Sequence, residues 1–199
     1  MNSNWLILDW DGTLAYSSLI TKKEDEDLNM LPTFVNTLSV DRNGTVGETA
    51  LFLRPNAKDF LQKISQKYNL ILWSFGTKKY IKECMESTGF ASFFSRIVVR
   101  EMMKYQIKDL FNLNIPLNKI AIVDDANDTF GILNPVNCID IPSWSFHFQD
   151  DSILKVMDIL INYHFKNIMA QYDRHDLEKK RMEIIQNLNA LNERQSGVQ

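Results

Sequence analysis

The fold is decided by the stretch Trp5-Leu6-Ile7-Leu8-Asp9-Trp10-Asp11-Gly12-Thr13-Leu14. Its apolar run, Trp5 to Leu8, predicts a buried strand, and apolar residues on both faces suit a parallel sheet covered by helices on both sides. Gly12 lets the chain turn sharply off the strand end. Asp9 and Asp11 should therefore lie at the carboxyl edge of the sheet, where open α/β sheets bind their ligands.

The two aspartates repel each other unless a cation lies between them or one is protonated. A structural interpretation competes with chemistry, because Asp-x-Asp-Gly also occurs in turns and in calcium loops. A calcium loop of the EF-hand type needs further oxygen ligands and a closing Glu. Ser17 and Ser18 are poor candidates for such ligands, and no Glu falls at the right place.

The composition is ordinary for a soluble globular domain: 199 residues, 45% hydrophobic, 24% charged, net charge −3. No basic stripe is present, so we expect no nucleic-acid ligand, and no apolar run is long enough to cross a bilayer. The N-terminus lacks the basic region and cleavage site of a signal peptide. We expect a cytoplasmic protein, with secretion without a cleaved signal as the alternative. Cys84 and Cys138 form no metal or redox spacing, and we expect buried reduced thiols.

The segment after the opening stretch predicts an inserted hairpin. Ala15 to Leu31 indicates a polar connection with an acidic cluster at Glu24 to Asp27. Phe34–Val40 and Thr45–Leu53 are rich in β-prone residues, and the Asn-Gly pair at Asn43-Gly44 between them is a strong turn signal. We expect an antiparallel flap, residues 34–53, directly after the first strand.

Strands and helices alternate through the rest of the domain. Further strands are predicted at Asn69–Ser74, Ile97–Arg100, Lys119–Asp125 and Cys138–Ile141, and helices from Arg54 to Tyr68, from Thr77 to Met85 and, in short form, from Tyr105 to Leu113. This alternation predicts an α/β fold with a doubly wound, parallel, five-stranded Rossmann-like sheet. Right-handed crossovers place the strand ends on one edge of such a sheet. The residues that should converge there are Asp9, Asp11, Ser74, Asp124 and Asp125.

The C-terminal residues 151–199 differ from the domain that precedes them, residues 1–150. Ile153 to Ile168 predicts an amphipathic helix, and Asp173 to Arg194 predicts a second, highly charged one with apolar residues at helical spacing. We expect the apolar face of this second helix to pack on the domain or on the preceding helix. The alternative is that this face binds a partner helix, or that the segment is part of a truncated further domain.

Four motifs, in this order, resemble the haloacid dehalogenase superfamily of aspartate-nucleophile phosphotransferases. Within it, the chain looks most like the branch of the small carboxy-terminal-domain phosphatases and their mitochondrial import relative. The motifs are Asp9-Trp10-Asp11-Gly12-Thr13-Leu14; the hairpin running into Leu53-Arg54-Pro55; Trp73-Ser74-Phe75-Gly76-Thr77-Lys78-Lys79-Tyr80; and Tyr105-Gln106-Ile107-Lys108-Asp109-Leu110 with Ile122-Val123-Asp124-Asp125. The chain departs from this branch at three positions. The branch usually has Glu at the position of Gly12 and Thr at that of Ser74, and it often has Asn at that of Asp125.

The resemblance implies a phosphatase with an aspartyl-phosphate intermediate. Asp9 would be the nucleophile, and Asp11 the general acid for the leaving oxygen and then the base for the attacking water. Ser74 would hydrogen-bond a phosphate oxygen. Lys108 would neutralise the phosphate; Lys104 is the rival, and the Tyr-x-x-Lys-Asp-Leu context favours Lys108.

The expected cofactor is Mg²⁺. This ion prefers few carboxylates together with waters and substrate oxygens, which fits an aspartate-only set without His or Cys. Asp9, Asp124 and Asp125 would hold it, and in this family Asp11 contributes its backbone carbonyl. Which of Asp124 and Asp125 touches the metal is left open. Thr13 either orients a carboxylate or closes the turn.

A phosphatase competes with two other classes. A degenerate phosphatase fold that serves as a binding module would have lost the aspartate pair, which is intact in this chain. A dehalogenase needs neither a second carboxylate nor a metal, so Asp11 and the Asp124-Asp125 pair argue against it.

The substrate class depends on the cap. A hairpin flap is too small to seal the site, and no long insertion follows Ser74, so we expect a phosphorylated side chain on a protein. The branch suggests phosphoserine or phosphothreonine. Trp10, Trp73 and Phe75 are expected in the core, but one of them could line an aromatic ring, which leaves phosphotyrosine open. A small phosphorylated metabolite or a nucleotide is the alternative.

Overall fold

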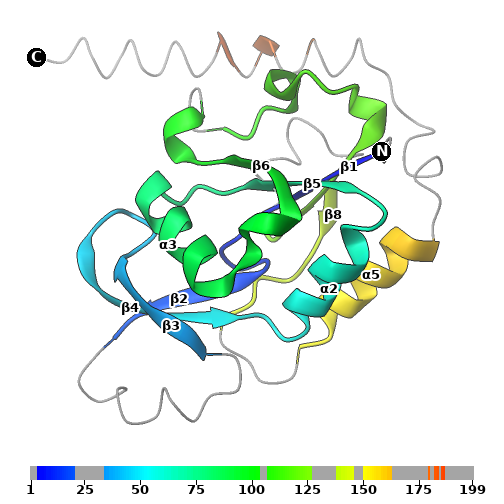
Figure 1. The fold of residues 1–199 in the computed structure, drawn as a ribbon. Helices are drawn as coiled ribbons and strands as arrows, with labels where there is room; N and C mark the ends of the chain where they lie inside the picture. Colours follow the sequence, from blue (N-terminus) through cyan, green and yellow to red (C-terminus); the bar gives the residue numbers. More distant parts are fainter. Residues whose placement is uncertain are drawn as a thin grey trace, which may run out of the picture.

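The computed structural model of the 199-residue chain describes residues 4–20, 34–103, 107–126, 138–145 and 150–162, and residues 179, 182, 183, 185 and 186 of the tail. The strands are β1 Trp5–Leu8, β2 Ala15–Leu19, β3 Phe34–Val40, β4 Val46–Leu53, β5 Asn69–Trp73, β6 Phe94–Val98, β7 Ile120–Asp124 and β8 Cys138–Asp140 (Figure 1). The α-helices are α2 Ala57–Ile64, α3 Lys78–Thr88 and α5 Ser152–Asn162. Short 3-10 helices are η1 Phe90–Phe93, η2 Arg100–Met102, η4 Leu110–Leu113 and η5 Leu117–Lys119.

A five-stranded parallel sheet forms the centre of the molecule, in the order β6-β5-β1-β7-β8. The first strand lies in the middle and pairs with β5 on one side and β7 on the other, with Trp5 opposite both Asn69 and Ile120. The strand order reverses at β1, as in doubly wound Rossmann-like sheets. The predicted fold class is confirmed. Asp9 directly follows the strand at which the order reverses.

The two faces of the sheet bury alternate residues of its strands. Leu6 and Leu8 of β1 belong to a core cluster that includes the buried faces of α2, α3 and α5. Ile7 points to the opposite face and belongs to a second cluster with Leu110 and Leu117. Within the described residues, the second face is covered by 3-10 turns rather than by regular helices.

The flap is a small antiparallel sheet of three strands, in the order β2-β4-β3. The predicted hairpin is confirmed as β3 and β4, but the prediction that Ala15 to Leu31 is a polar connection was wrong for its first part, which is β2. Because Ser17 and Ser18 are polar, this strand gives no apolar pattern by which it could be predicted. It exists because it pairs with β4, which lies far along the sequence. The acidic cluster Glu24 to Asp27 lies outside the described residues.

Two further elements differ from their predicted form. β6 spans Phe94–Val98 rather than Ile97–Arg100, because the exposed Ser95 and Arg96 mask the edge strand, while Arg100 already begins η2. The helix predicted from Tyr105 is only a 3-10 turn, Leu110–Leu113, in the part that the structure describes. Asp109 caps this turn by accepting a hydrogen bond from the backbone N–H of Phe111 (3.2 Å).

The predicted C-terminal helix is present as α5 up to Asn162. The rest of that helix and most of the predicted helix from Asp173 to Arg194 lie outside the described residues. The division into residues 1–150 and 151–199 stays a prediction. None of the helices that the structure describes is long and apolar enough to cross a bilayer.

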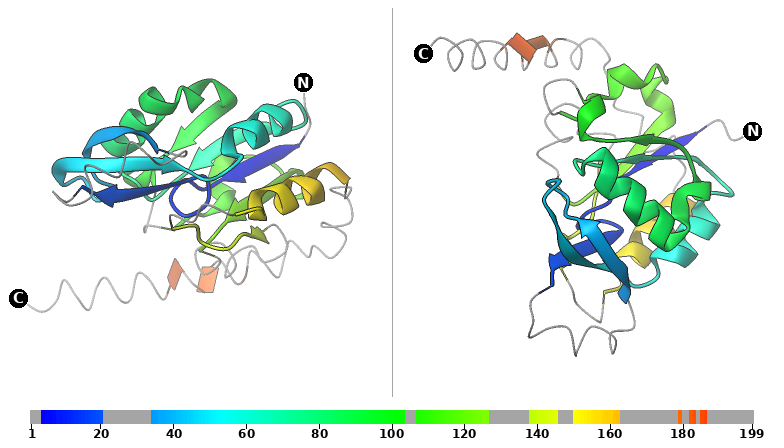
Figure 2. Two further views of the ribbon diagram at one scale, coloured as in Figure 1. Left: turned by 90° about the horizontal axis from the view of Figure 1, so that it is seen from below. Right: turned by 60° about the vertical axis from the view of Figure 1, so that its left-hand side comes forward.

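The flap lies beyond the carboxyl end of β1 and stands beside α3 (Figure 2). Glu83 of α3 attaches it: the carboxylate accepts hydrogen bonds from the backbone N–H groups of Ser39 (2.8 Å) and Val40 (3.3 Å), and another from the Ser39 hydroxyl. Burial raises the pKa of Glu83, but these hydrogen bonds outweigh it, so the pKa lies below its usual value. The flap is therefore fixed to the domain along β3.

Arg54 fixes the loop after β1 by hydrogen bonds to its backbone. Its side chain is fully buried at the end of β4. The guanidinium donates to the carbonyl oxygens of Gly12 (3.1 Å), Thr13 (3.0 Å) and Pro142 (2.6 Å), and it forms an ion pair with Asp150 (2.7 Å). Asp150 also accepts the backbone N–H of Ser152 at the start of α5 (2.7 Å). A single cation thus joins the aspartate loop, the flap and α5.

Asp150→Asn should destabilise the fold by about 3 kcal/mol, because it leaves a buried guanidinium short of its counter-ion. Burial raises the pKa of Asp150, but the hydrogen bonds from Ser152 and Arg54 lower it by a larger amount. The folded-state pKa therefore lies below the unfolded value. This carboxylate therefore stabilises the fold above its unfolded pKa, and the stabilisation is lost as pH falls through the folded pKa. Urea unfolding of wild type and variant from neutral pH to pH 3 measures both effects.

Asp151→Asn is the matched control for this measurement. Asp151 forms an exposed ion pair with Lys155 (2.9 Å), and exposed pairs contribute about 0.5 kcal/mol or less. Equal losses of unfolding free energy in the two variants would contradict the role given to Arg54. So would a difference between wild type and Asp150→Asn that does not shrink in acid.

Candidate active site

The ends of three strands and the loops beside them meet at one cavity of about 280 Å³. Asp9 follows β1, Ser74 follows β5, Asp124 is the last residue of β7, and Asp125 follows it. Asp11 and Lys108 also line the cavity. The structure therefore brings together all six residues that the sequence singled out. The rival Lys104 lies outside the described residues.

Lys108 holds the centre of the cavity wall. Its ammonium group donates to Asp9 Oδ1 and to Asp124 Oδ2, at 2.6 Å each, and all three side chains are buried. The same group lies 5.2 Å from the centroid of the Phe75 ring, a cation–π contact. One ammonium thus connects the ends of two neighbouring strands.

The charge of this cluster is unbalanced. Burial raises the pKa of Asp9, the Lys108 charge lowers it, and the Asp124 charge raises it again, to a net value of about 8. Burial alone would lower the pKa of Lys108, but the two carboxylates raise it above its usual value, so the lysine stays a cation. A further cation, or a change in the charge of the site, is needed for Asp9 to be fully ionised near neutral pH.

Asp11 lies in a different environment from Asp9. The Tyr80 hydroxyl donates to Asp11 Oδ1 (2.5 Å) and lies 3.0 Å from the hydroxyl of Ser17. Burial raises the pKa of Asp11 to about 6, although the Tyr80 hydrogen bond and the Arg42 charge act in the opposite direction. Burial and the neighbouring carboxylate keep the pKa of Tyr80 well above its usual value, so it remains a donor. Tyr80 stood in a quoted motif, but no sequence pattern assigned it this contact.

Asp125 is oriented by the loop after β1. The Thr13 hydroxyl donates to Asp125 Oδ1 (3.1 Å), so Thr13 orients a carboxylate, one of its two predicted roles. Gly12 has φ +80°, and a Cβ there would lie 2.2 Å from Asp125 Oδ2 and 2.8 Å from the Ser143 hydroxyl. Gly12 is required both by its backbone conformation and by the position of Asp125.

The carboxylates of Asp9, Asp124 and Asp125 fit a hard cation. One oxygen from each lies within 4.8 Å of the others, and among the described residues these are the ones that form such a cluster. Oxygen ligands of this kind suit Mg²⁺. The Asp11 carboxylate is outside this cluster because it faces Tyr80. A contribution from its backbone carbonyl stays a prediction.

Ser74 is positioned by the turn after β5. Its backbone N–H donates to the carbonyl of Val98 (3.0 Å), and its hydroxyl oxygen accepts the N–H of Gly76 (2.9 Å). Because the oxygen accepts this bond, the hydroxyl hydrogen is left as a donor toward the cavity. Of the three aromatic residues expected in the core, Trp10 and Trp73 are buried there, whereas Phe75 lines the cavity.

Two arginines at the cavity were not identified from the sequence. Arg42, at the tip of the flap, and Arg100, after β6, both line it. Arg100 donates to the carbonyl of Phe75 (2.6 Å) and to the carbonyl of Arg42 (2.9 Å), and so connects the flap tip to the turn after β5. These contacts join distant parts of the chain, and no local pattern marks them.

A family model, NLI interacting factor-like phosphatase, matches residues 4–171. Among curated proteins, Phosphatase Herzog of Drosophila melanogaster is 28% identical over 72% of this chain and 39% of its own length. A CTD small phosphatase-like protein of Homo sapiens is 24% identical over 78% of this chain and 53% of its own length. The chain thus spans about half or less of the curated relatives it matches.

Solved structures share the fold. Fission yeast Fcp1, an RNA polymerase II CTD phosphatase bound to beryllium fluoride, superposes with a TM-score of 0.58 at 18% identity, over 93% of this chain and 56% of that one. A HAD-superfamily hydrolase of Ehrlichia chaffeensis gives a TM-score of 0.52 at 12% identity, over 81% of this chain and 98% of that one. At these identities the likeness supports the fold alone.

Gly12→Ala should lower the unfolding free energy by more than 2 kcal/mol, an approximate sum of about 1 kcal/mol of backbone strain and the cost of moving Asp125. It should also weaken Mg²⁺ binding, measured as the shift of the melting temperature with added Mg²⁺. Gly89→Ala is the control: its φ is +69°, but a Cβ there meets nothing within 4 Å. Equal losses in both variants, with the Mg²⁺ response intact, would contradict this account of Gly12.

Proposed function

Since this chain belongs to the family of NLI interacting factor-like phosphatases, we propose that it is a Mg²⁺-dependent phosphatase that removes phosphate from protein side chains through an aspartyl-phosphate. The observation that carries the proposal is the Asp9 carboxylate at the cavity wall, which accepts a bond from Lys108 and forms the acidic cluster with Asp124 and Asp125. Asp11 lines the same cavity outside that cluster and accepts a bond from Tyr80. Phosphate monoesters hydrolyse extremely slowly unaided, so a site for them needs concentrated positive charge. Lys108 and a metal ion held by the acidic cluster would supply it.

The proposed reaction has two displacements. In the first, an Asp9 oxygen forms a bond to phosphorus, the bond to the leaving oxygen breaks, and protonated Asp11 gives that oxygen its proton. In the second, Asp11 takes a proton from water, the water oxygen attacks phosphorus, and the bond to Asp9 breaks. Inorganic phosphate leaves, and both aspartates return to their starting states.

The different surroundings of the two aspartates support these separate roles. Asp9 contacts a buried ammonium group, which favours its ionised form, whereas Asp11 accepts a bond from a neutral hydroxyl. A pKa of about 6 leaves part of Asp11 protonated near neutral pH and is close to what a general acid and base needs. The pKa of Asp9, about 8 without a metal, has to fall below that of Asp11 for these roles, and a Mg²⁺ ion beside Asp9 would lower it.

We assign the direct metal contact to Asp125 rather than to Asp124. Both oxygens of Asp124 have protein donors: Lys108 at Oδ2 (2.6 Å) and the backbone N–H of Ala126 at Oδ1 (2.8 Å). Asp9 and Asp125 would hold the ion, and Asp124 would hold Lys108. When bound, Mg²⁺ supplies positive charge that favours ionised Asp9 and neutralises phosphate oxygens.

The remaining groups would hold the phosphoryl oxygens. The Ser74 hydroxyl and the Lys108 ammonium line the same cavity as Asp9 and can each donate to a bound phosphate. The described flap is a three-stranded sheet fixed to α3, not a domain that closes over the site. A site that the described flap leaves open suits a phosphorylated side chain on a protein. Phosphatase activity on a small metabolite or a nucleotide is the second candidate.

Asp9→Asn should lower kcat by about 10³-fold or more, since the amide is no longer a nucleophile, and a chelator should abolish wild-type activity. Phosphate release would be measured on phosphoserine, phosphothreonine and phosphotyrosine peptides and on nucleotides. Asp59→Asn, the same change at an exposed position of α2, is the control and should keep full activity. Activity that survives both chelation and Asp9→Asn would overturn the mechanism, and activity on nucleotides alone would favour the second candidate.

Asp11→Asn should separate the two displacements. Without a general acid, release of a poor leaving group such as a serine side chain should slow by about 10²–10⁴-fold, whereas release of p-nitrophenolate should change little. The second displacement also lacks its base, so p-nitrophenyl phosphate should give a burst of one p-nitrophenolate per enzyme, followed by slow turnover. Equal slowing of the first step with both leaving groups would refute the role of Asp11.

A further inference from the structure

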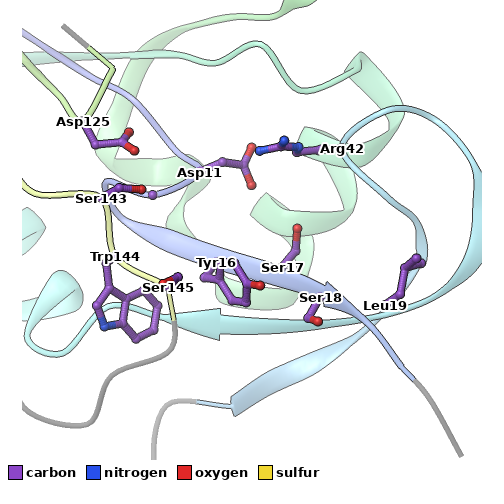
Figure 3. A pocket seen from close by; sticks show the side chains of 11 residues that line it. Asp11, Tyr16, Ser17, Ser18, Leu19, Arg42, Asp125, Ser143, Trp144 and Ser145 are labelled. Carbon is purple, nitrogen blue, oxygen red and sulfur yellow. The ribbon is translucent and has the colours of Figure 1, made fainter.

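A second cavity, of about 430 Å³, adjoins the candidate active site. It lies between β2 of the flap and the segment 143–145, as Figure 3 shows. Asp11, Arg42 and Asp125 line both cavities. The Asp11 carboxylate therefore stands at the boundary between them.

The position of Asp11 indicates what enters the second cavity. In the proposed reaction the phosphoryl group lies against Asp9 and Lys108, and Asp11 contacts the leaving oxygen. A substrate that passes Asp11 continues toward β2. The lining there is rich in hydroxyl groups, from Tyr16, Ser17, Ser18, Ser143 and Ser145. Leu19 and Trp144 complete the lining, so the cavity can hold polar substrate groups beside an apolar surface.

Arg42 is the cation among the described residues that line this cavity. Figure 3 shows its side chain directed from the flap tip toward Asp11. Its charge lowers the pKa of Asp11, but no hydrogen bond or ion pair joins its guanidinium to a residue that the structure describes. The other cations of the site are engaged, Lys108 by two carboxylates and Arg100 by two carbonyls. Arg42 therefore keeps its donors for a ligand.

The backbone that carries Arg42 is held in place. The carboxylate of Asp41 accepts the N–H groups of Asn43 and Thr45, at 2.8 Å each, which closes the turn. Arg100 donates to the carbonyl of Arg42 itself (2.9 Å). A donor on a fixed turn loses less entropy on binding than one on a mobile loop.

The charges around the second cavity would oppose most anions. Asp11 and Asp125 line it, and two carboxylates repel a negatively charged substrate group unless a cation compensates. Arg42 provides that cation at the side facing Asp11. A guanidinium binds carboxylate and phosphoryl groups through paired hydrogen bonds.

We infer that Arg42 makes this enzyme select phosphopeptides with a second negatively charged group near the phosphorylated residue. The group is a carboxylate or a second phosphoryl, which share the same chemistry toward a guanidinium. Arg42 contacts that group in the second cavity while the phosphoryl to be removed lies against Asp9. The inference rests on the proposed function and names the substrates within it.

The experiment compares kcat/KM for three forms of one phosphopeptide. A single residue, placed in turn at each position within three residues of the phosphorylated one, is Gln, Glu or a non-hydrolysable phosphonate analogue of phosphoserine. Wild type should prefer the Glu form over the Gln form by about 5–10-fold at the best position, as expected for one charge-assisted contact. The phosphonate arm shows whether a phosphoryl is preferred to a carboxylate.

Arg42→Gln should reduce the preference to less than about 2-fold, and Arg42→Glu should reverse it. Because the ratio of two peptides is compared, any effect of Arg42 on the Asp11 carboxyl cancels. Arg96→Gln removes the same charge at an exposed position of β6 outside both cavities and should leave the preference unchanged. High salt should weaken the preference of the wild type.

Each outcome has one meaning. Wild type that hydrolyses the Gln and Glu forms equally at every position, or a preference that survives in Arg42→Gln, overturns the inference while the proposed function stands. An equal loss of preference in Arg96→Gln shows that overall charge, not Arg42, is responsible. If wild type releases phosphate from none of the peptides, the proposed function fails, and the inference falls with it.

Discussion

The ammonium group of Lys108, 2.6 Å from both Asp9 and Asp124, is the interaction on which the site depends. Asp9 and Asp124 can share this lysine because their strands are neighbours whose carboxyl ends lie level. In the sheet, β1 lies beside β7 in parallel, with Leu8 opposite Val123. Taking three charged groups out of water is costly, and the cost is offset only by close and complete pairing. The order of the strands is therefore what allows Lys108 to pair with both carboxylates of the site.

The pairing is incomplete, and this determines what the site can bind. Counting Asp125, three carboxylates face one ammonium, and burial raises the pKa of Asp9 to about 8. These four groups sum to a charge of −2, so a divalent cation bound among them would bring the net charge of the cluster to zero. A water molecule or a neutral ligand would not. The protein groups by themselves are thus less favourably paired than they could be, as expected where residues are selected for binding rather than for folding.

The sequence predicted the parts that follow from parallel strands. Asp9, Ser74 and Asp124 each end an apolar run, and the rule that such ends share one edge correctly predicted that they lie together. Lys108 ends no strand, so only its resemblance to a family motif identified it. The strand β2 was missed because its serines give no apolar pattern and its partner lies far along the chain. The roles of Arg42, Arg54 and Arg100 were not predicted, although Arg54 lies in a quoted motif, because each acts through carbonyls or cavities formed by distant segments.

This division has a consequence for specificity. The residues proposed for the chemistry lie on the sheet edge, where alteration of one strand would disturb its neighbours. The residues proposed to face the rest of a substrate lie on the flap and on the segment 143–145. The flap is held by buried side chains that belong to the core, such as Leu38 and Leu51, and both segments are held by bonds from Glu83, Arg54 and Arg100. A flap held this way can change its exposed side chains without cost to the core, as surface loops on rigid scaffolds do. Arg42 has this position: its backbone is fixed by Asp41 and Arg100, while its side chain is exposed. The substrate can therefore differ between relatives that share the sheet edge, and it must be inferred from the flap rather than from the aspartates.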